Sequence, residues 1–308
     1  MRALFAPAVG LFLSLSFAAA WAAPVRDQRA LQPDGELRVR MEAGRITVRA
    51  GTEPQALVEA NLFPAQALRW RGDARGLALI IDDGTRLRPR DAELLLTVPA
   101  GVRLFLSVGD GAVDAEGVGA AGLVISGGDG DVRVVAAAGT LAASTRAGRI
   151  DAELGAADAR LSTLSGAVVA RSGQGPPRLT VQTLSGAVEV SLAAPERVTI
   201  ETVSGDVAAR FESLQGADVQ LESLRGNVLL DVPQGVAASL ELDAAKGKVA
   251  LPPDAAQQPD GSVRLGEGGG RVVMGSFTGG LTVSATRVPA RPEAVTPLTP
   301  PVANPPVR

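Results

Sequence analysis

A glycine that returns every 18 to 21 residues constrains this chain more than any other feature. Similar short words surround it, such as Thr-Leu-Ser-Gly-Ala-Val and Thr-Val-Ser-Gly-Asp-Val. The recurring glycines are Gly111, Gly130, Gly148, Gly166, Gly186, Gly205, Gly226 and Gly247. A repeat of this length indicates a solenoid, in which each unit buries its apolar face only by stacking on its neighbours.

Apolar residues hold four fixed positions around each glycine. In the repeat of Gly186 they are Leu179, Val181, Val188 and Val190, and the same positions are apolar in all eight repeats. The last repeat supplies Leu240, Leu242, Val249 and Leu251 around Gly247. Alternation with a period of two on both sides of the glycine predicts two short strands per repeat, each with one face buried.

The residues just before the glycine bear on how the two strands are joined. The position two before it holds Leu164, Leu184, Val203 and Leu224 in four consecutive repeats, each after a Thr or Ser. We expect these apolar side chains to point inward, so that the inward phase slips by one residue at a corner between two sheets. A flat hairpin with a two-residue turn is the alternative, and it would expose them. The pattern favours a parallel β-solenoid with rungs about 4.8 Å apart.

Degenerate copies flank the regular array of residues 104–251. One surrounds Gly44, and residues 51–103 separate it from the array. These residues predict antiparallel strands around a turn at 71–74, a cap over an open solenoid end. The other copy, 272–285, follows residues 252–271, which are predicted to form a surface loop.

Both termini differ in composition from the repeats. Arg2, an apolar stretch and Ala20-Trp21-Ala22 predict a signal peptide over residues 1–22. An uncleaved N-terminal anchor is the alternative reading. Residues 23–34 are expected to be a linker, 35–288 a β-repeat domain, and 289–308 a disordered proline-rich tail. The sequence therefore predicts an exported protein of the periplasm, the cell surface or the medium.

Three short motifs resemble a known family. They are Ala-Gly-Arg-Ile-Thr-Val at 43–48, Leu-Thr-Val-Pro-Ala-Gly-Val at 96–102, and Ser-Gly-Asp/Ala-Val at 165–168, 185–188 and 204–207. They resemble the bacterial putative-adhesin family of β-strand-repeat domains of unknown function, over about residues 35 to 285. The resemblance implies a β-helix-like fold and an envelope or extracellular setting. It brings no catalytic residues with it.

The composition excludes several kinds of active site. The chain has no His and no Cys, which rules out Ser-His and Cys nucleophiles. Asp and Glu outnumber Lys and Arg by 33 to 30, which argues against nucleic-acid binding. The rival class is a carbohydrate-active β-helix, which would need carboxylates in a cleft and aromatic rings for stacking. Only 3% of the residues are aromatic and none is Tyr. We expect a non-enzymatic protein without a cofactor.

Residues 127–131, Gly-Gly-Asp-Gly-Asp, are similar to a calcium-binding nonapeptide. The second Asp comes one residue too early for that motif, and the motif is not repeated. We therefore expect these aspartates to form turns rather than to bind a metal.

One position, four before each glycine, is polar in every regular repeat. This polar column consists of Ser107, Ser126, Ser144, Ser162, Gln182, Glu201, Glu222 and Asp243. A solvated sheet face explains it without any ligand. As a binding surface, its three carboxylates would repel one another and suit a basic partner, and its hydroxyls would suit a polar chain such as a glycan. The predicted function is adhesin-like binding or a structural role in the envelope, with a polysaccharide or a protein as partner.

Overall fold

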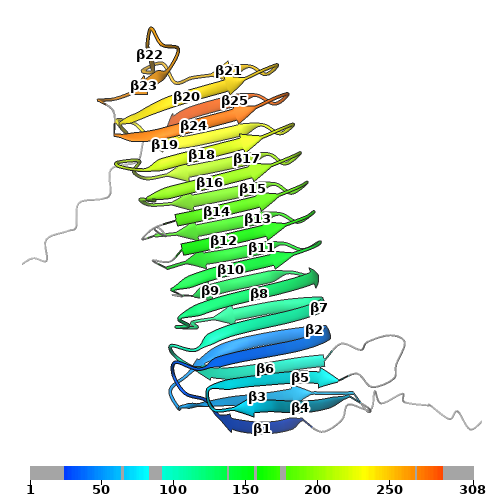
Figure 1. Ribbon diagram of the computed structural model, residues 1–308. Helices are drawn as coiled ribbons and strands as arrows, with labels where there is room; N and C mark the ends of the chain where they lie inside the picture. The colour runs from blue at the N-terminus through cyan, green and yellow to red at the C-terminus, as the bar shows by residue number, and fades with distance from the viewer. Residues whose placement is uncertain are drawn as a thin grey trace, which may run out of the picture.

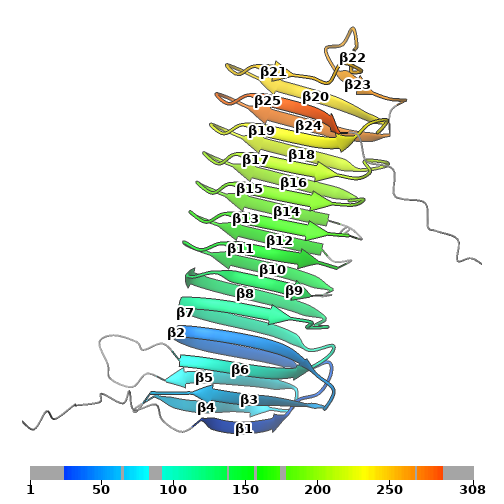
Figure 2. The ribbon, with the colours of Figure 1, turned by 180° about the vertical axis from the view of Figure 1, so that it is seen from behind.

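The computed structural model describes residues 24–63, 66–82, 92–136, 139–155, 158–173, 178–267 and 269–286. The predicted signal peptide and proline-rich tail lie outside these ranges. Strands stacked on one another form a long rod, seen from opposite sides in Figures 1 and 2. Across the ranges given, no helix has the length and apolar character needed to cross a membrane.

In the rungs of Gly130 to Gly226, one strand precedes the glycine and one follows it. The strands before it are β8 (Gly122–Asp129), β10 (Thr140–Thr145), β12 (Asp158–Thr163), β14 (Arg178–Thr183), β16 (Arg197–Thr202) and β18 (Asp218–Ser223). Those after it are β9 (Val132–Ala136), β11 (Ile150–Leu154), β13 (Val168–Ser172), β15 (Val188–Leu192), β17 (Val207–Phe211) and β19 (Val228–Pro233). Like strands pair in parallel, with equivalent residues in register. The predicted parallel β-solenoid is confirmed.

The predicted inward positions form the core. From the Gly111 rung to the Gly226 rung, every one of them is buried, and together they make one continuous hydrophobic cluster. The exceptions lie in the Gly247 rung, where Leu242 is partly buried and Val249 and Leu251 are exposed. That rung is the outermost one, so the last core positions are packed from one side only.

The recurring glycines are required because backbone crowds backbone at the corner. A Cβ atom on Gly186 would collide with the carbonyl oxygen of Gly166 in the rung below, and the same clash recurs along the column. A positive φ adds to this requirement at Gly44, where φ is 127°. The crowding explains why no larger residue occupies this position in any repeat.

The corner differs from the prediction in one respect. Leu164, Leu184 and Leu224 point outward and are 51%, 47% and 48% exposed, whereas the preceding Thr163 and Thr183 are buried. The expectation that these leucines face the core was wrong. The phase slips between the threonine and the glycine because a buried hydroxyl can satisfy polar backbone groups at the bend, which a leucine cannot do.

At the N-terminal end, the Gly44 copy joins the array directly. Strand β2 (Glu36–Gly51) pairs in parallel with β7 (Arg103–Glu116), which places Gly44 beside Gly111. The next layer contains β5 (Gly76–Asp82) and β6 (Ala92–Pro99), both parallel to β2. Strands β3 (Gln55–Asn61) and β4 (Ala67–Asp73) pair antiparallel to them. This is the predicted antiparallel cap.

The cap also recruits part of the segment expected to be a linker. Strand β1 (Val25–Ala30) pairs antiparallel with β3, so residues 23–34 are not a plain linker. The pairing covers an edge of β3 that would otherwise be open, which explains why a mostly exposed, charged segment forms a strand there.

At the C-terminal end, the rungs do not stack in sequence order. Strands β24 (Gly270–Ser276) and β25 (Leu281–Thr286) pair directly with β18 and β19. Strands β20 (Ala238–Ala244) and β21 (Val249–Ala250) pair with the opposite edges of β24 and β25. The Gly279 rung, predicted to be the last, is therefore inserted between the Gly226 and Gly247 rungs.

Residues 252–271 are not only a surface loop. They contain β22 (Ala256–Gln257), β23 (Val263–Leu265) and the first residues of β24. Strand β23 pairs antiparallel with β20 and buries Val263 and Leu265. The segment covers an edge of the outermost rung, so it acts as a second cap.

Candidate binding groove

The polar column lies on the outer face of the stack formed by the strands that precede the glycines. Ser162, Gln182 and Glu201 pair in register on β12, β14 and β16, and Glu222 follows on β18. Ser144 and Ser162 are partly buried, whereas Ser107, Ser126, Gln182, Glu201, Glu222 and Asp243 are exposed. The predicted column therefore exists as a line of side chains parallel to the rod axis.

The inserted rung interrupts the acidic end of this column. Gly275 pairs with Glu222 on one side and with Asp243 on the other. The prediction that three carboxylates stand on consecutive rungs was wrong, because it assumed that Gly247 follows Gly226 in space. Only Glu201 and Glu222 are neighbours, and Asp243 stands two rungs from Glu222.

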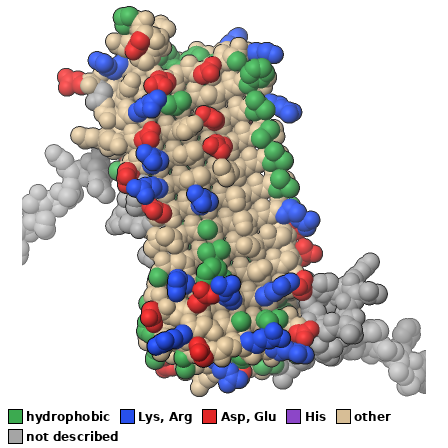
Figure 3. Space-filling view, viewed as in Figure 1, with side chains coloured by type: hydrophobic (Ala, Val, Ile, Leu, Met, Phe, Trp, Pro, Cys, Tyr) green, Lys and Arg blue, Asp and Glu red, His purple; other side chains and the backbone are tan. Residues whose placement is uncertain are grey.

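A second line of side chains runs beside the polar column, at the first residue after the end of each strand. We call it the apolar ridge; it consists of Leu164, Leu184, Val203, Leu224 and Phe277. Figure 3 shows a line of hydrophobic side chains along one edge of the rod. Among the described residues, eight large hydrophobic side chains are exposed, and four of them belong to this ridge. Such alignment distinguishes the ridge from the isolated apolar residues found on any protein surface.

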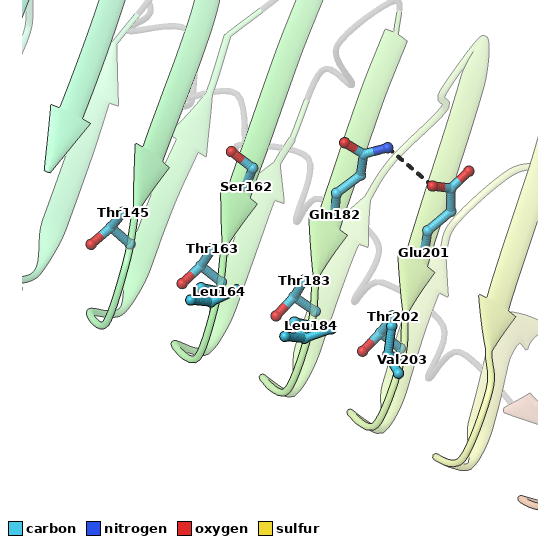
Figure 4. Close-up of a pocket in the computed structure, with 10 residues that line it drawn as sticks. All are labelled: Thr145, Ser162, Thr163, Leu164, Gln182, Thr183, Leu184, Glu201, Thr202 and Val203. Atoms are coloured by element: carbon cyan, nitrogen blue, oxygen red, sulfur yellow. Dashed lines mark hydrogen bonds between the residues drawn. The ribbon is translucent and has the colours of Figure 1, made fainter. Parts of the chain in front are cut away.

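A shallow groove lies between the polar column and the apolar ridge. One stretch is lined by Ser162, Gln182 and Glu201 on one side and by Leu164, Leu184 and Val203 on the other (Figure 4). A second stretch continues past Glu222, Leu224 and Phe277 to Asp243. Glu201 and Thr202 line both stretches, so the two form one groove along the rod axis.

The floor of the groove consists of buried hydroxyl groups. Oγ1 of Thr183 accepts a hydrogen bond of 3.0 Å from the amide of Gly186, and the equivalent hydroxyls do the same. Those are Thr163, Thr202, Ser223 and Ser276. The hydroxyl of Ser223 also donates to the carbonyl of Gly205 at 3.0 Å. These bonds hold the corner of each rung together, which leaves the two walls as the surfaces offered to a ligand.

The charged side chains that line the groove are all acidic. Glu201 accepts a hydrogen bond of 3.0 Å from Gln182, and Glu222 accepts one of 2.7 Å from Gln220. Within the described part of the chain, neither carboxylate has a cationic partner. At the far end, Nζ of Lys246 lies 4.8 Å from the centre of the Phe277 ring. The groove thus offers acceptors and negative charge along one wall and apolar surface along the other.

The aspartates of the calcium-like motif are engaged in local contacts. Asp129 accepts a hydrogen bond of 2.9 Å from Nε of Arg146, and Asp131 accepts one of 2.8 Å from the amide of Arg149. Across the ranges that the structure describes, no group of three or more carboxylate, His or Cys side chains is placed to hold a metal ion.

Sequence reasoning identified one wall of the groove and misassigned the other. The signal for the ridge was present in the Thr-Leu-Ser-Gly word, because either Thr or Leu can occupy the inward position before the corner. Hydrophobicity alone favours Leu. The glycine amide that needs an acceptor three residues after the threonine favours Thr.

The fold and the groove define a class of protein: a parallel β-solenoid built of β-strand repeats, with an open surface groove. Residues 89–267 match the model of the Toastrack DUF4097 family. The match spans more than half of the chain, and the chain belongs to this family. The predicted resemblance is thereby confirmed.

The solved structures that match this chain share little sequence with it. One is a putative cell adhesion protein from Clostridium sporogenes, with 8% identity, a TM-score of 0.20, and coverage of 86% of this chain and 100% of the other. A putative lipid binding protein from Parabacteroides distasonis has 11% identity and a TM-score of 0.46, covering 85% and 96%. A putative adhesin from Bacteroides fragilis has 10% identity and a TM-score of 0.34, covering 85% and 97%. No curated protein matches the chain.

Proposed function

We propose that this chain is an exported, non-enzymatic binding protein of the bacterial cell envelope or cell surface, and that it binds along the groove. The observation that carries this proposal is the apolar ridge beside the polar column. A solvated sheet face needs polar side chains but gains nothing from a line of five apolar side chains, four of them exposed. A surface that binds a partner uses both kinds of side chain.

Binding suits this groove better than catalysis does. Glu201 and Glu222 lie on an open face, and each accepts a hydrogen bond from a neighbouring amide side chain. The whole sequence lacks His and Cys, and it lacks Tyr for stacking on sugar rings. Export is supported by the signal-like residues 1–22. An envelope polysaccharide or an envelope protein is the class of partner that such a protein would meet.

Co-sedimentation of the purified full-length chain with bacterial envelope fractions tests the proposal, at low and at physiological salt. We expect saturable binding that weakens when Leu184→Ser is combined with Leu224→Ser, and when Glu201→Arg is combined with Glu222→Arg. Leu229→Ser is the matched control, because Leu229 is 39% exposed and lies on β19, in the other strand stack. The proposal fails if all these folded variants bind as the wild type does.

A further inference from the structure

The lining of the groove also indicates the chemistry of its partner, and this inference rests on the proposed function. We propose that the groove receives an amphipathic α-helix of a partner protein, laid along the rod axis. In this arrangement the apolar stripe of the helix packs on the apolar ridge. Basic side chains beside that stripe face Glu201 and Glu222.

The spacing of the rungs favours a helix over an extended strand. The ridge repeats about every 4.8 Å, whereas a helix presents the same face every turn, about 5.4 Å. A strand presents the same face about every 6.7 Å. From Leu164 to Phe277 there are four rung steps, or about 19 Å. Over four steps, the repeat of a helix falls out of register with the ridge by about 2.4 Å, and the repeat of a strand by about 8 Å. Only the helix keeps a side chain near every step of the ridge.

The charges of the groove select a basic helix. All charged residues that line its two stretches are acidic, namely Glu201, Glu222 and Asp243. The described residues supply no ion-pair partner for them. Lysine or arginine side chains of a partner would relieve the repulsion between the neighbouring carboxylates of Glu201 and Glu222. Lys246, above the ring of Phe277, places a positive charge at the C-terminal end of the groove, beyond the rung of Glu222. The basic residues of the helix therefore belong beside Glu201 and Glu222 rather than next to Lys246.

Other occupants fit these observations less well. An anionic membrane surface would meet the same carboxylates, which stand on the same face as the ridge. A second copy offers only strands among its described residues. A single line of apolar side chains about 19 Å long also offers much less area than the roughly 1,200–2,000 Å² that a stable dimer buries.

Peptide titration onto the full-length chain tests the inference. The probe is a labelled peptide of Leu and Lys, about 18 residues long, with its leucines on one helical face. Two reference peptides accompany it: one has the same composition in scrambled order, and the other has Glu in place of Lys. Fluorescence anisotropy reports affinity, and the difference circular dichroism spectrum reports helix formation.

We expect the amphipathic Leu/Lys peptide to bind saturably and to become helical. Affinity should fall about tenfold or more when Leu184→Ser is combined with Leu224→Ser. A similar fall is expected when Glu201→Gln is combined with Glu222→Gln. The difference in affinity between the wild type and this variant should be smaller at high salt. Leu229→Ser and Glu189→Gln, on the other strand stack, should leave affinity unchanged.

Several outcomes would overturn the inference. One is equal binding of the scrambled or the acidic peptide, and another is binding without helix formation. A third is unchanged affinity in both groove variants. If none of the three peptides binds while envelope fractions still bind in a groove-dependent way, the helix inference fails and the proposed function stands. If the groove variants also bind envelope fractions as the wild type does, the helix inference and the proposed function both fail.

Discussion

Asp231 accepts a hydrogen bond of 2.6 Å from the hydroxyl of Thr286, a residue 55 positions further along the chain. The same carboxylate accepts bonds from Nε of Arg210 at 2.8 Å and from the hydroxyl of Ser284 at 2.9 Å. Asp231 thus joins three stacked strands, β17, β19 and β25, and its side chain is only 12% exposed. It holds the inserted Gly279 rung against the regular array.

Asp231→Asn should destabilise the C-terminal end of the rod. The substitution removes the charge that three donors share and leaves some of them without a good acceptor, at a cost of about 2–3 kcal/mol. Hydrogen exchange should show faster opening of β24 and β25 than of β10 to β16. Glu189→Gln, an exposed change on β15, is the control. If β24 and β25 exchange no faster in Asp231→Asn than in Glu189→Gln, Asp231 has no local role at this end of the rod.

The same carboxylate should make stability depend on acid pH. Burial by itself would raise the pKa of Asp231, but hydrogen bonds from Thr286, Arg210 and Ser284 outweigh burial and leave the pKa below its usual range. A carboxyl with a lowered folded-state pKa contributes stability above its unfolded pKa of about 3.9. That contribution disappears as pH falls through the folded value. Denaturant midpoints measured from pH 6 to pH 2.5 should therefore fall less steeply in Asp231→Asn than in the wild type.

Gly186→Ala should be far more damaging than Gly173→Ala. A Cβ at position 186 would collide with the carbonyl of Gly166, whereas a Cβ at position 173 meets nothing within 4 Å. Since the colliding atom is backbone, whole rungs must shift, and we expect a loss of several kcal/mol against less than about 1 kcal/mol at Gly173. Thermal denaturation of both variants measures the difference. Equal melting temperatures would contradict the crowding explanation.

Val188→Asp and Glu189→Val test which face of β15 is buried. Val188 is 1% exposed, so an unpaired charge there should cost several kcal/mol and could prevent folding. Glu189 points outward, and its replacement should change the free energy of unfolding by less than about 1 kcal/mol. Chemical denaturation gives both values. Similar losses at the two positions would mean that the face is misassigned.

Export can be tested on the protein purified from its host. The Ala20-Trp21-Ala22 pattern predicts cleavage after Ala22, so N-terminal sequencing should begin at Ala23. Recovery of the protein from the cytosol with residues 1–22 intact would contradict this prediction, and an intact terminus in the membrane fraction would indicate the uncleaved anchor.

The sequence alone determined the repeat, the strands and most of the core. Alternation is a local property of a strand, so Leu179, Val181, Val188 and Val190 identify the buried face without knowledge of the fold. The glycine column was equally visible, because every rung meets the same steric restriction at its corner. The polar column followed from the same alternation.

Only the tertiary structure decided the order of the rungs and the direction of the corner leucines. Repeats with nearly equivalent faces can stack on one another in more than one order, so sequence proximity suggested Gly247 beside Gly226. Long-range contacts, including the bond from Thr286 to Asp231, instead place Gly279 there. At the corner, Thr183 and Leu184 both suit a strand. The choice between them depends on a glycine amide that needs an acceptor inside the rod, and that need exists only once the rungs have stacked.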